Sequence, residues 1–277
     1  MIPQTLTVIT SNGEEFIIET NNAMEVLNFL PPSPFYNAQY EKIDGNHGEI
    51  DLGGSFDARD NIRTKILFYA KDIWDFYLFR DEIFKLFASQ EPFYIITNRQ
   101  PGKRWKVRVA NTYEIEPQAF GQYGEFNIIF KSASSFCESV GTTMDPFTFD
   151  SGLWQIGQSL PAEDLIYKHS TSSFRIYNAS DIEIDPRKLP LVIRILGATN
   201  GLTITNRTTA DVFKLNIPTT AGDTIELNRV RVFKNGNTVF TSTNRKVIRL
   251  APGWNDFIVS GISGAFQIEF DFRFYYL

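Results

Sequence analysis

Few residues of this 277-residue sequence have the types and spacing that catalysis or metal binding requires. A zinc site needs several histidine or cysteine ligands within reach of one another. The sequence offers only His47, His169 and Cys137, each in an unrelated context, and Cys137 lies in no recognisable nucleophile motif. A nucleophile elbow, a phosphate-binding loop and a dinucleotide-binding glycine motif are all missing. The sequence therefore predicts no enzyme activity, no catalytic residues, no metal and no cofactor.

Two weaker patterns leave other function classes open. Asp57 and Asp60 could offer oxygen ligands to Ca²⁺, but the ordered spacing of a calcium loop is missing. Four aromatic residues could stack on a sugar, although aromatic residues of a β-sandwich more often belong to its core: Trp154, Tyr167, Tyr177 and Trp254. The first alternative function is therefore a monomeric carbohydrate-binding adhesion module. The second is a hydrolase with two carboxylates, which no particular spacing supports.

The composition is that of a folded globular chain. Hydrophobic residues make up 43% of it and charged residues 21%. The 25 phenylalanines can fill a core or a subunit interface, because aromatic side chains bury large areas. No apolar run approaches the ~20 residues of a membrane-spanning helix, and no signal-peptide pattern opens the sequence. We expect synthesis in a reducing cytoplasm, which the single cysteine also fits.

The first half of the sequence predicts strands around one helix. LTVIT and EFIIE alternate around Ser11-Asn12-Gly13, a hairpin signal. A helix is predicted from Lys71 to about Ser89, followed by a hairpin around Pro101-Gly102. A second hairpin is predicted from about Tyr113 to Phe130, with its turn near Gly121–Gly124. The apolar residues of this helix are not confined to one narrow stripe of its surface, and they include Ile73, Phe76, Tyr77, Phe84 and Phe87. We therefore expect this helix to be buried on two sides, against its own sheet and against something else.

The second half of the sequence predicts strands only, spaced as in a sandwich. Its last strand places six apolar side chains on one face: Phe266, Ile268, Phe270, Phe272, Phe274 and Tyr276. A run of Ser, Gly and Thr separates the halves. The sequence thus predicts a mainly β protein with domains at 1–140 and 141–277.

Negative charge is concentrated in the first half. Residues 1–140 carry a net charge of −6 and residues 141–277 carry +1, and neither half shows the basic stripe of a nucleic-acid-binding protein. Residues 41–60 contain six acidic residues and only two basic ones, Lys42 and Arg59. The acidic residues are Glu41, Asp44, Glu49, Asp51, Asp57 and Asp60. Because four glycines lie among them, we expect a mobile acidic loop.

The order of these elements resembles the distal tail proteins of phages with long, non-contractile tails. The resemblance rests on the glycine-bearing segment from Gly48 to Arg63, the helix with Arg80, the Pro101-Gly102-Lys103 turn and the closing Phe126-Ile128-Phe130 pattern. The final GWNDFIVSG and FQIEFDFRFYYL also resemble the C-terminal strands of that family.

The resemblance implies a fold, an assembly and a set of partners. The N-terminal domain is expected to be β-barrel-like with one helix, and the C-terminal domain to be a galectin-like (jelly-roll) β-sandwich. Six copies would form a ring at the tail tip, joining the tail tube protein to a tail-associated lysin-like tip protein and to receptor-binding or baseplate proteins. DNA would pass through without specific binding. On this interpretation the five helical residues are candidates for the ring interface, and the six acidic residues are candidates for the channel lining.

Overall fold

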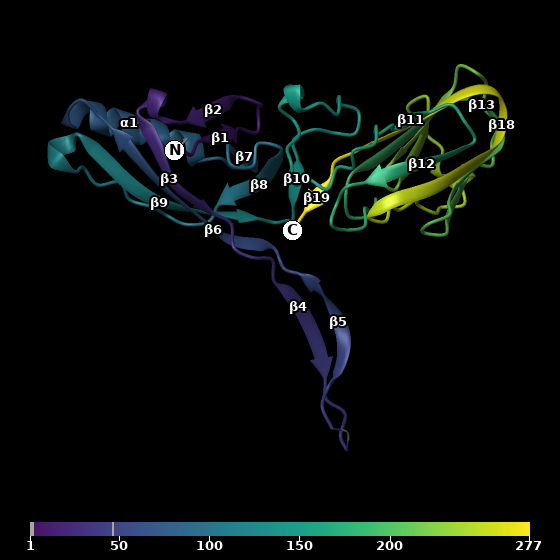
Figure 1. Cartoon of the computed structure of the whole chain (residues 1–277), viewed down its shortest axis with the longest axis horizontal. Helices are drawn as coiled ribbons and strands as arrows, with labels where there is room; N and C mark the ends of the chain where they lie inside the picture. The colour runs from purple at the N-terminus through teal and green to yellow at the C-terminus, as the bar shows by residue number, and fades with distance from the viewer. Residues whose placement is uncertain (1–2, 46) are drawn as a thin grey trace. The chain divides into compact units, whose positions relative to one another are not determined.

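The computed structural model describes residues 3–45 and 47–277 (Figure 1). The chain divides into two compact units, residues 1–137 with Leu277 and residues 138–276. The mainly β class is confirmed, since strands dominate both units and the described residues contain one α-helix, α1 (Ile73–Phe87). The longest helix of the described residues is thus too short to cross a membrane.

The N-terminal unit is built on one antiparallel sheet with the strand order β2-β1-β7-β8-β9-β6-β3. These strands are β1 (Leu6–Ile9), β2 (Glu15–Ile18), β3 (Met24–Leu30), β6 (Arg59–Tyr69), β7 (Phe93–Thr97), β8 (Lys103–Val109) and β9 (Tyr123–Ser132). The predicted hairpin at Ser11-Asn12-Gly13 joins β1 to β2, with Gly13 at a φ of +87°. Within the described residues no pairing joins β2 to β3, so this barrel-like sheet is not closed.

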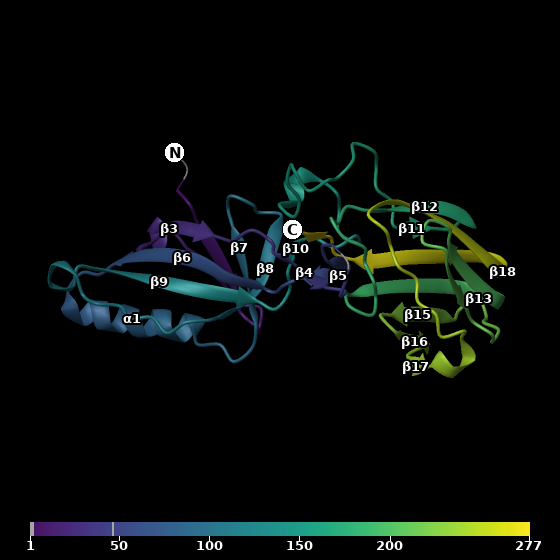
Figure 2. The same cartoon turned by 90° about the horizontal axis from the view of Figure 1, so that it is seen from below.

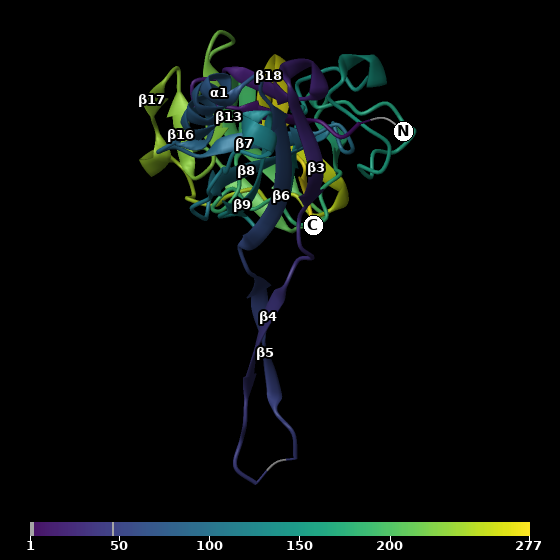
Figure 3. The same cartoon turned by 90° about the vertical axis from the view of Figure 1, so that its left-hand side faces the viewer.

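Two segments of this unit differ from the prediction. The residues from Tyr113 to Gln118 form no strand and meet β9 only through a bridge from Gln118 to Tyr123. Tyr113 instead stacks on Phe126 with ring centroids 5.1 Å apart. The predicted acidic loop is a hairpin of β4 (Tyr36–Glu41) and β5 (Ile50–Phe56) (Figure 3). Short 3₁₀ turns complete the unit at η1 (Thr20–Asn22) and η2 (Ala119–Gly121).

Helix α1 packs along the sheet of its own unit, beside β9 and β6 (Figure 2). It begins after Asp72, whose carboxylate accepts hydrogen bonds from the backbone N–H groups of Trp74 and Asp75 at 2.9 Å. The ring of Phe76 lies 5.1 Å from that of Phe68. A Cβ at Gly124 would come within 2.8 Å of both of these rings, so the close packing of helix on sheet requires glycine there.

The C-terminal unit centres on two long, bent strands, β13 (Leu191–Asn206) and β18 (Gly253–Phe272). Their pairing shifts register between Gly197 and Thr203, and Gly261 turns at a φ of +77° against the backbone of Gly201. Phe257 and Phe270 come from opposite halves of β18, yet their ring centroids are 4.9 Å apart. The halves of one strand therefore pack face to face across the core, as in a sandwich.

Shorter elements complete this unit. The remaining strands of its sheet are β11 (Lys168–His169), β12 (Ser173–Asn178), β14 (Asp211–Lys214), β15 (Thr224–Asn228), β16 (Arg231–Lys234) and β17 (Asn237–Thr238), with 3₁₀ turns η3 (Phe149–Ser151) and η4 (Phe240–Ser242). Two short strands, β10 (Cys137–Ser139) and β19 (Tyr275–Tyr276), lie outside this sheet and pair with each other. Of the six predicted apolar residues of the last strand, five are buried and Phe266 is half-buried. The one-sided pattern of that strand therefore holds up to Phe272, where β18 ends. Beyond that point the prediction of one continuous strand is wrong, because Tyr275 of β19 is buried as well as Phe274 and Tyr276.

His169 provides a pH-dependent contribution to the stability of this unit. Its ring stacks on Phe174 with centroids 4.3 Å apart, and burial lowers the pKa of the imidazole below 6.5. The unfolded chain then takes up a proton at a higher pH than the folded chain, so stability falls as the pH drops below about 6.5. We expect His169→Phe to flatten this dependence between pH 7 and pH 5, measured by urea unfolding. An unchanged slope would contradict the assignment.

Candidate assembly surfaces

The exposed side of helix α1 is more apolar than a solvated surface requires. Phe76, Ile83 and Phe87 face the sheet and are buried. On the other side, Trp74 is 77% exposed and Leu78 is 69% exposed. These two residues are four positions apart and therefore adjacent on the helix surface. Together with Tyr77 they form an apolar patch of the kind that marks interaction sites.

Arg80 fixes the neighbouring part of this helix surface. Its guanidinium carbon lies 4.7 Å from the ring centroid of Tyr77 and 5.5 Å from that of Phe84. The same guanidinium donates hydrogen bonds to the carboxylate of Asp81 at 3.0 and 3.2 Å. The cation thereby covers part of both rings while its charge stays accessible to water.

The structure divides the five predicted interface residues. Ile73 and Phe84 are half-buried and Tyr77 is 41% exposed, so these three can contribute to an outer surface. The prediction is wrong for Phe76 and Phe87, because their side chains pack in the core. Trp74 and Leu78 were missed. Their spacing of four residues places them next to each other on the helix surface. The sequence does not tell, however, which of the two apolar stripes of the helix faces the sheet.

The hairpin of β4 and β5, residues 36–56, is called the arm below. Within the described residues, β4 and β5 pair only with each other. Glu41 and Asp51 lie on its strands, and Asp44 and Glu49 lie in the segment that joins them. Asp57 follows β5, and Asp60 lies on β6 with its carboxylate 2.7 Å from the ammonium of Lys131. Four of the six predicted acidic residues thus belong to the arm, and Asp57 and Asp60 lie beyond it.

Apolar side chains are also exposed along the arm, where the sequence predicts a mobile acidic loop. They are Tyr36 (47%), Tyr40 (60%), Ile43 (42%), Ile50 (46%) and Leu52 (58%). A solvated loop would not need these residues. A register shift between Ala38 and Tyr40 interrupts the alternation that would indicate a strand, so the sequence pattern alone predicts a loop.

A buried arginine anchors the base of the arm. Arg59 is 3% exposed and donates hydrogen bonds to the carbonyl of Pro32 at 2.8 Å and to that of Ser135 at 3.0 and 3.2 Å. Its guanidinium carbon lies 5.4 Å from the ring of Trp105. The Ser135 hydroxyl donates to the carbonyls of Phe56 and Asp57. This cluster joins both ends of the arm to the body of the N-terminal unit.

The other candidates from the sequence are mostly buried in the part of the chain that the structure describes. No group of three or more His, Cys, Asp and Glu side chains among the described residues could hold a metal ion. Cys137 is buried. Trp154 and Tyr167 are also buried, as expected for core aromatic residues, so these four residues do not together form the sugar platform that the sequence left open. Tyr177 and Trp254 remain half-buried neighbours, with Arg175 stacked 4.0 Å from the Trp254 ring.

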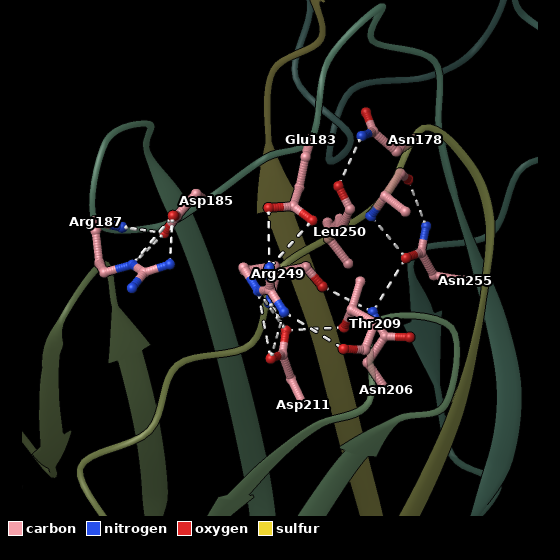
Figure 4. A network of polar contacts seen from close by, with 11 residues as sticks. Asn178, Glu183, Asp185, Arg187, Asn206, Thr209, Asp211, Arg249, Leu250 and Asn255 are labelled. Atoms are coloured by element: carbon pink, nitrogen blue, oxygen red, sulfur yellow. Dashed lines mark hydrogen bonds and ion pairs between the residues drawn. The ribbon is translucent and has the colours of Figure 1, made fainter. Parts of the chain in front are cut away.

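A polar network in the C-terminal unit has a structural role (Figure 4). The guanidinium of Arg249 binds the carboxylate of Asp211 at 3.0 Å and that of Glu183 at 3.3 Å. The buried Asn206 amide donates to the carbonyl of Arg249 at 2.7 Å and to the side chain of Asn255 at 3.0 Å. These bonds fasten the irregular segment around Arg249 to the neighbouring strands, because it lacks a full strand ladder of its own.

Comparisons with known proteins agree with this architecture. Residues 11–132 match the family described as the phage tail protein RIFT-related domain. Among solved structures, the Dit (gp 19.1) protein of phage SPP1, described as a paradigm of the hub adsorption apparatus in phages that infect Gram-positive bacteria, superposes with a TM-score of 0.70 at 12% identity. The alignment covers 98% of this chain and 99% of that one.

The baseplate of phage P2 in its activated conformation with Ca is also similar, with a TM-score of 0.48 at 11% identity and coverage of 98% of each chain. No curated protein matches the chain by sequence. The predicted resemblance to distal tail proteins is confirmed by the family match together with the shared fold.

Proposed function

We propose that this chain, which carries a phage tail protein RIFT-related domain and has the fold of a distal tail protein, is the structural hub of a phage tail tip. The observation that carries the proposal is the family match of residues 11–132, which contain both the patch on α1 and the arm. In this role the N-terminal unit makes the assembly and the C-terminal unit holds outer components. The chain would be synthesised in the host cytoplasm.

The assembly is a ring of six copies that joins the tail tube to the tip and receptor-binding proteins and lets DNA pass. An apolar patch on the helix supports self-association, because Trp74 and Leu78 would leave water only by meeting another surface. The carbohydrate-binding alternative has less support, since two of its four aromatic residues belong to the core. Mass measurement of the purified full chain separates a ring from a monomer.

Substitution of the helix patch tests the assembly directly. We expect Trp74→Glu combined with Leu78→Glu to raise the concentration at half-assembly by about 30-fold or more, the effect of losing one interface hot spot. Light scattering coupled to gel filtration measures it. Ile156→Glu is the control, because Ile156 is 89% exposed in the C-terminal unit. Normal assembly of the double variant would exclude the helix patch as the interface.

The acidic residues of the arm are a second element of the proposal. Glu41, Asp44, Glu49 and Asp51 would face the lumen, with Asp57 and Asp60 nearby, and repel the DNA backbone. Six copies of such a segment brought together repel one another, so moderate salt would then strengthen the ring. A ring that becomes more stable as salt rises would support this location of the arm, and a ring that becomes less stable would contradict it.

A further inference from the structure

We propose that a groove in the C-terminal unit binds an extended segment of a partner protein, in which an apolar side chain lies beside a lysine or arginine. The identity of that partner as an outer component of the tail tip rests on the hub function proposed above. The groove measures about 820 Å³. It is lined by residues 143–148 and 160–168 together with Trp154, and all of these belong to the C-terminal unit.

Stacked aromatic rings form the floor of the groove. The ring centroid of Phe147 lies 4.5 Å from that of Trp154 and 5.4 Å from that of Tyr167. The buried Trp154 indole donates a hydrogen bond to the carbonyl of Pro146 at 2.8 Å. The buried Tyr167 hydroxyl donates to the carbonyl of Tyr177 at 2.7 Å. These bonds fix the floor, and the half-buried Phe147 presents it to solvent.

Further apolar side chains surround the aromatic floor. Met144, Leu160 and Leu165 line the groove and are half-buried, and Ile166 is 56% exposed. Apolar groups gathered in one concave surface are typical of binding sites. An apolar side chain of a partner that covered Ile166 and Phe147 would remove them from water, which favours association.

The backbone along one part of the groove is available for pairing. Residues 160–165 belong to no strand or helix. Within the described part of the chain, no hydrogen bond engages their backbone N–H or C=O groups. An extended peptide can pair with such groups through its own backbone, as it does when it adds to the open edge of a sheet. The groove therefore fits an extended segment.

Two carboxylates of the groove call for a positive charge on that segment. The Asp145 carboxylate accepts hydrogen bonds from the backbone N–H and the hydroxyl of Thr142, at 2.7 and 3.1 Å, which are neutral donors. Asp164 is exposed and has no ion-pair partner among the described residues. Lys168 also lines the groove, but its ammonium already lies 3.6 Å from the carboxylate of Glu269. A lysine or arginine of the partner would complement Asp145 and Asp164.

Peptide binding by the full chain tests the groove. The probes are three capped, rhodamine-labelled hexapeptides in which leucine alternates with lysine, serine or glutamate, and fluorescence anisotropy measures their affinity. We expect the lysine peptide to bind about tenfold or more tightly than the serine peptide, and the glutamate peptide to bind least. Asp145→Asn with Asp164→Asn should weaken the lysine peptide about tenfold and leave the serine peptide unchanged. Asparagine keeps an oxygen that can accept from Thr142.

An apolar substitution and two matched controls complete the test. Ile166→Ser should weaken the lysine and serine peptides about fivefold, because a contact that buries the isoleucine is lost. Ile156→Ser is its control, since Ile156 is 89% exposed in the same unit but does not line the groove. Glu114→Gln with Glu116→Gln is the control for charge, at exposed positions of the N-terminal unit. Circular dichroism confirms that each variant is folded.

The outcomes separate this inference from the proposed function. The groove is overturned if the wild-type chain shows no saturable binding at about 1 mM lysine peptide, or if the groove variants bind as well as their controls. Light scattering on the same variants should show unchanged rings, because the substitutions lie outside the N-terminal unit. Rings without peptide binding leave the hub function standing. A wild-type chain that binds the lysine peptide but stays monomeric overturns the ring and retains the groove.

Discussion

Deletion of residues 266–277 is expected to leave the C-terminal unit unable to fold. The deletion removes the half of β18 that pairs with Leu191–Gly197 of β13. It also removes five buried apolar side chains, Ile268, Phe270, Phe272, Phe274 and Tyr276. Full burial of each is worth roughly 1.5–3 kcal/mol, so the sum reaches the ~5–15 kcal/mol net stability of a whole domain. Insoluble protein, or soluble protein without near-ultraviolet circular dichroism, is the expected result.

Single substitutions on the same strand give a graded version of this test. Phe270→Ala should lower the free energy of unfolding by about 3–5 kcal/mol, because the ring is fully buried against Phe257 and Phe174. Gln267→Ala lies on the exposed face of the strand and should cost less than about 0.5 kcal/mol. A soluble deletion variant with a native spectrum would show that the last strand does not hold the sandwich together.

Arg59→Ala is expected to destabilise the N-terminal unit by about 3–5 kcal/mol. Hydrogen bonds to a charged group contribute about 1.5–3 kcal/mol each, and Arg59 serves the carbonyls of both Pro32 and Ser135. Its burial also means that alanine would leave a cavity. Arg59→Lys should retain only part of this stability. Lysine keeps the positive charge, but its ammonium lacks the planar fork with which the guanidinium reaches both carbonyls. Denaturant unfolding followed by circular dichroism measures the loss.

The arm provides a second readout of the Arg59 variants. Loss of the anchor should increase trypsin cleavage at Lys42, because the base of the arm would open more often. Arg63→Ala is the matched control, since Arg63 is exposed on the same strand. Equal stability and equal cleavage of Arg59→Ala and wild type would show that the buried guanidinium does not hold the arm.

The sequence by itself determined the class of the fold and most of its elements. The helix predicted from Lys71 to about Ser89 is observed at Ile73–Phe87, and the alternating last strand is buried on the predicted face as far as Phe272. These elements were accessible because hydrophobic period and capping are local properties of the chain. The resemblance to distal tail proteins followed from the order of the same local elements.

Only the tertiary structure decided which residues are available for assembly. Phe76 and Trp74 lie two positions apart and are both apolar, yet one is buried and the other is 77% exposed. The side of the helix that faces the sheet is set by strands that are distant in sequence, such as β6 and β9. The arm was missed for the same reason. Its strands have no core of their own, so the pattern of one buried face that reveals other strands is absent from its sequence.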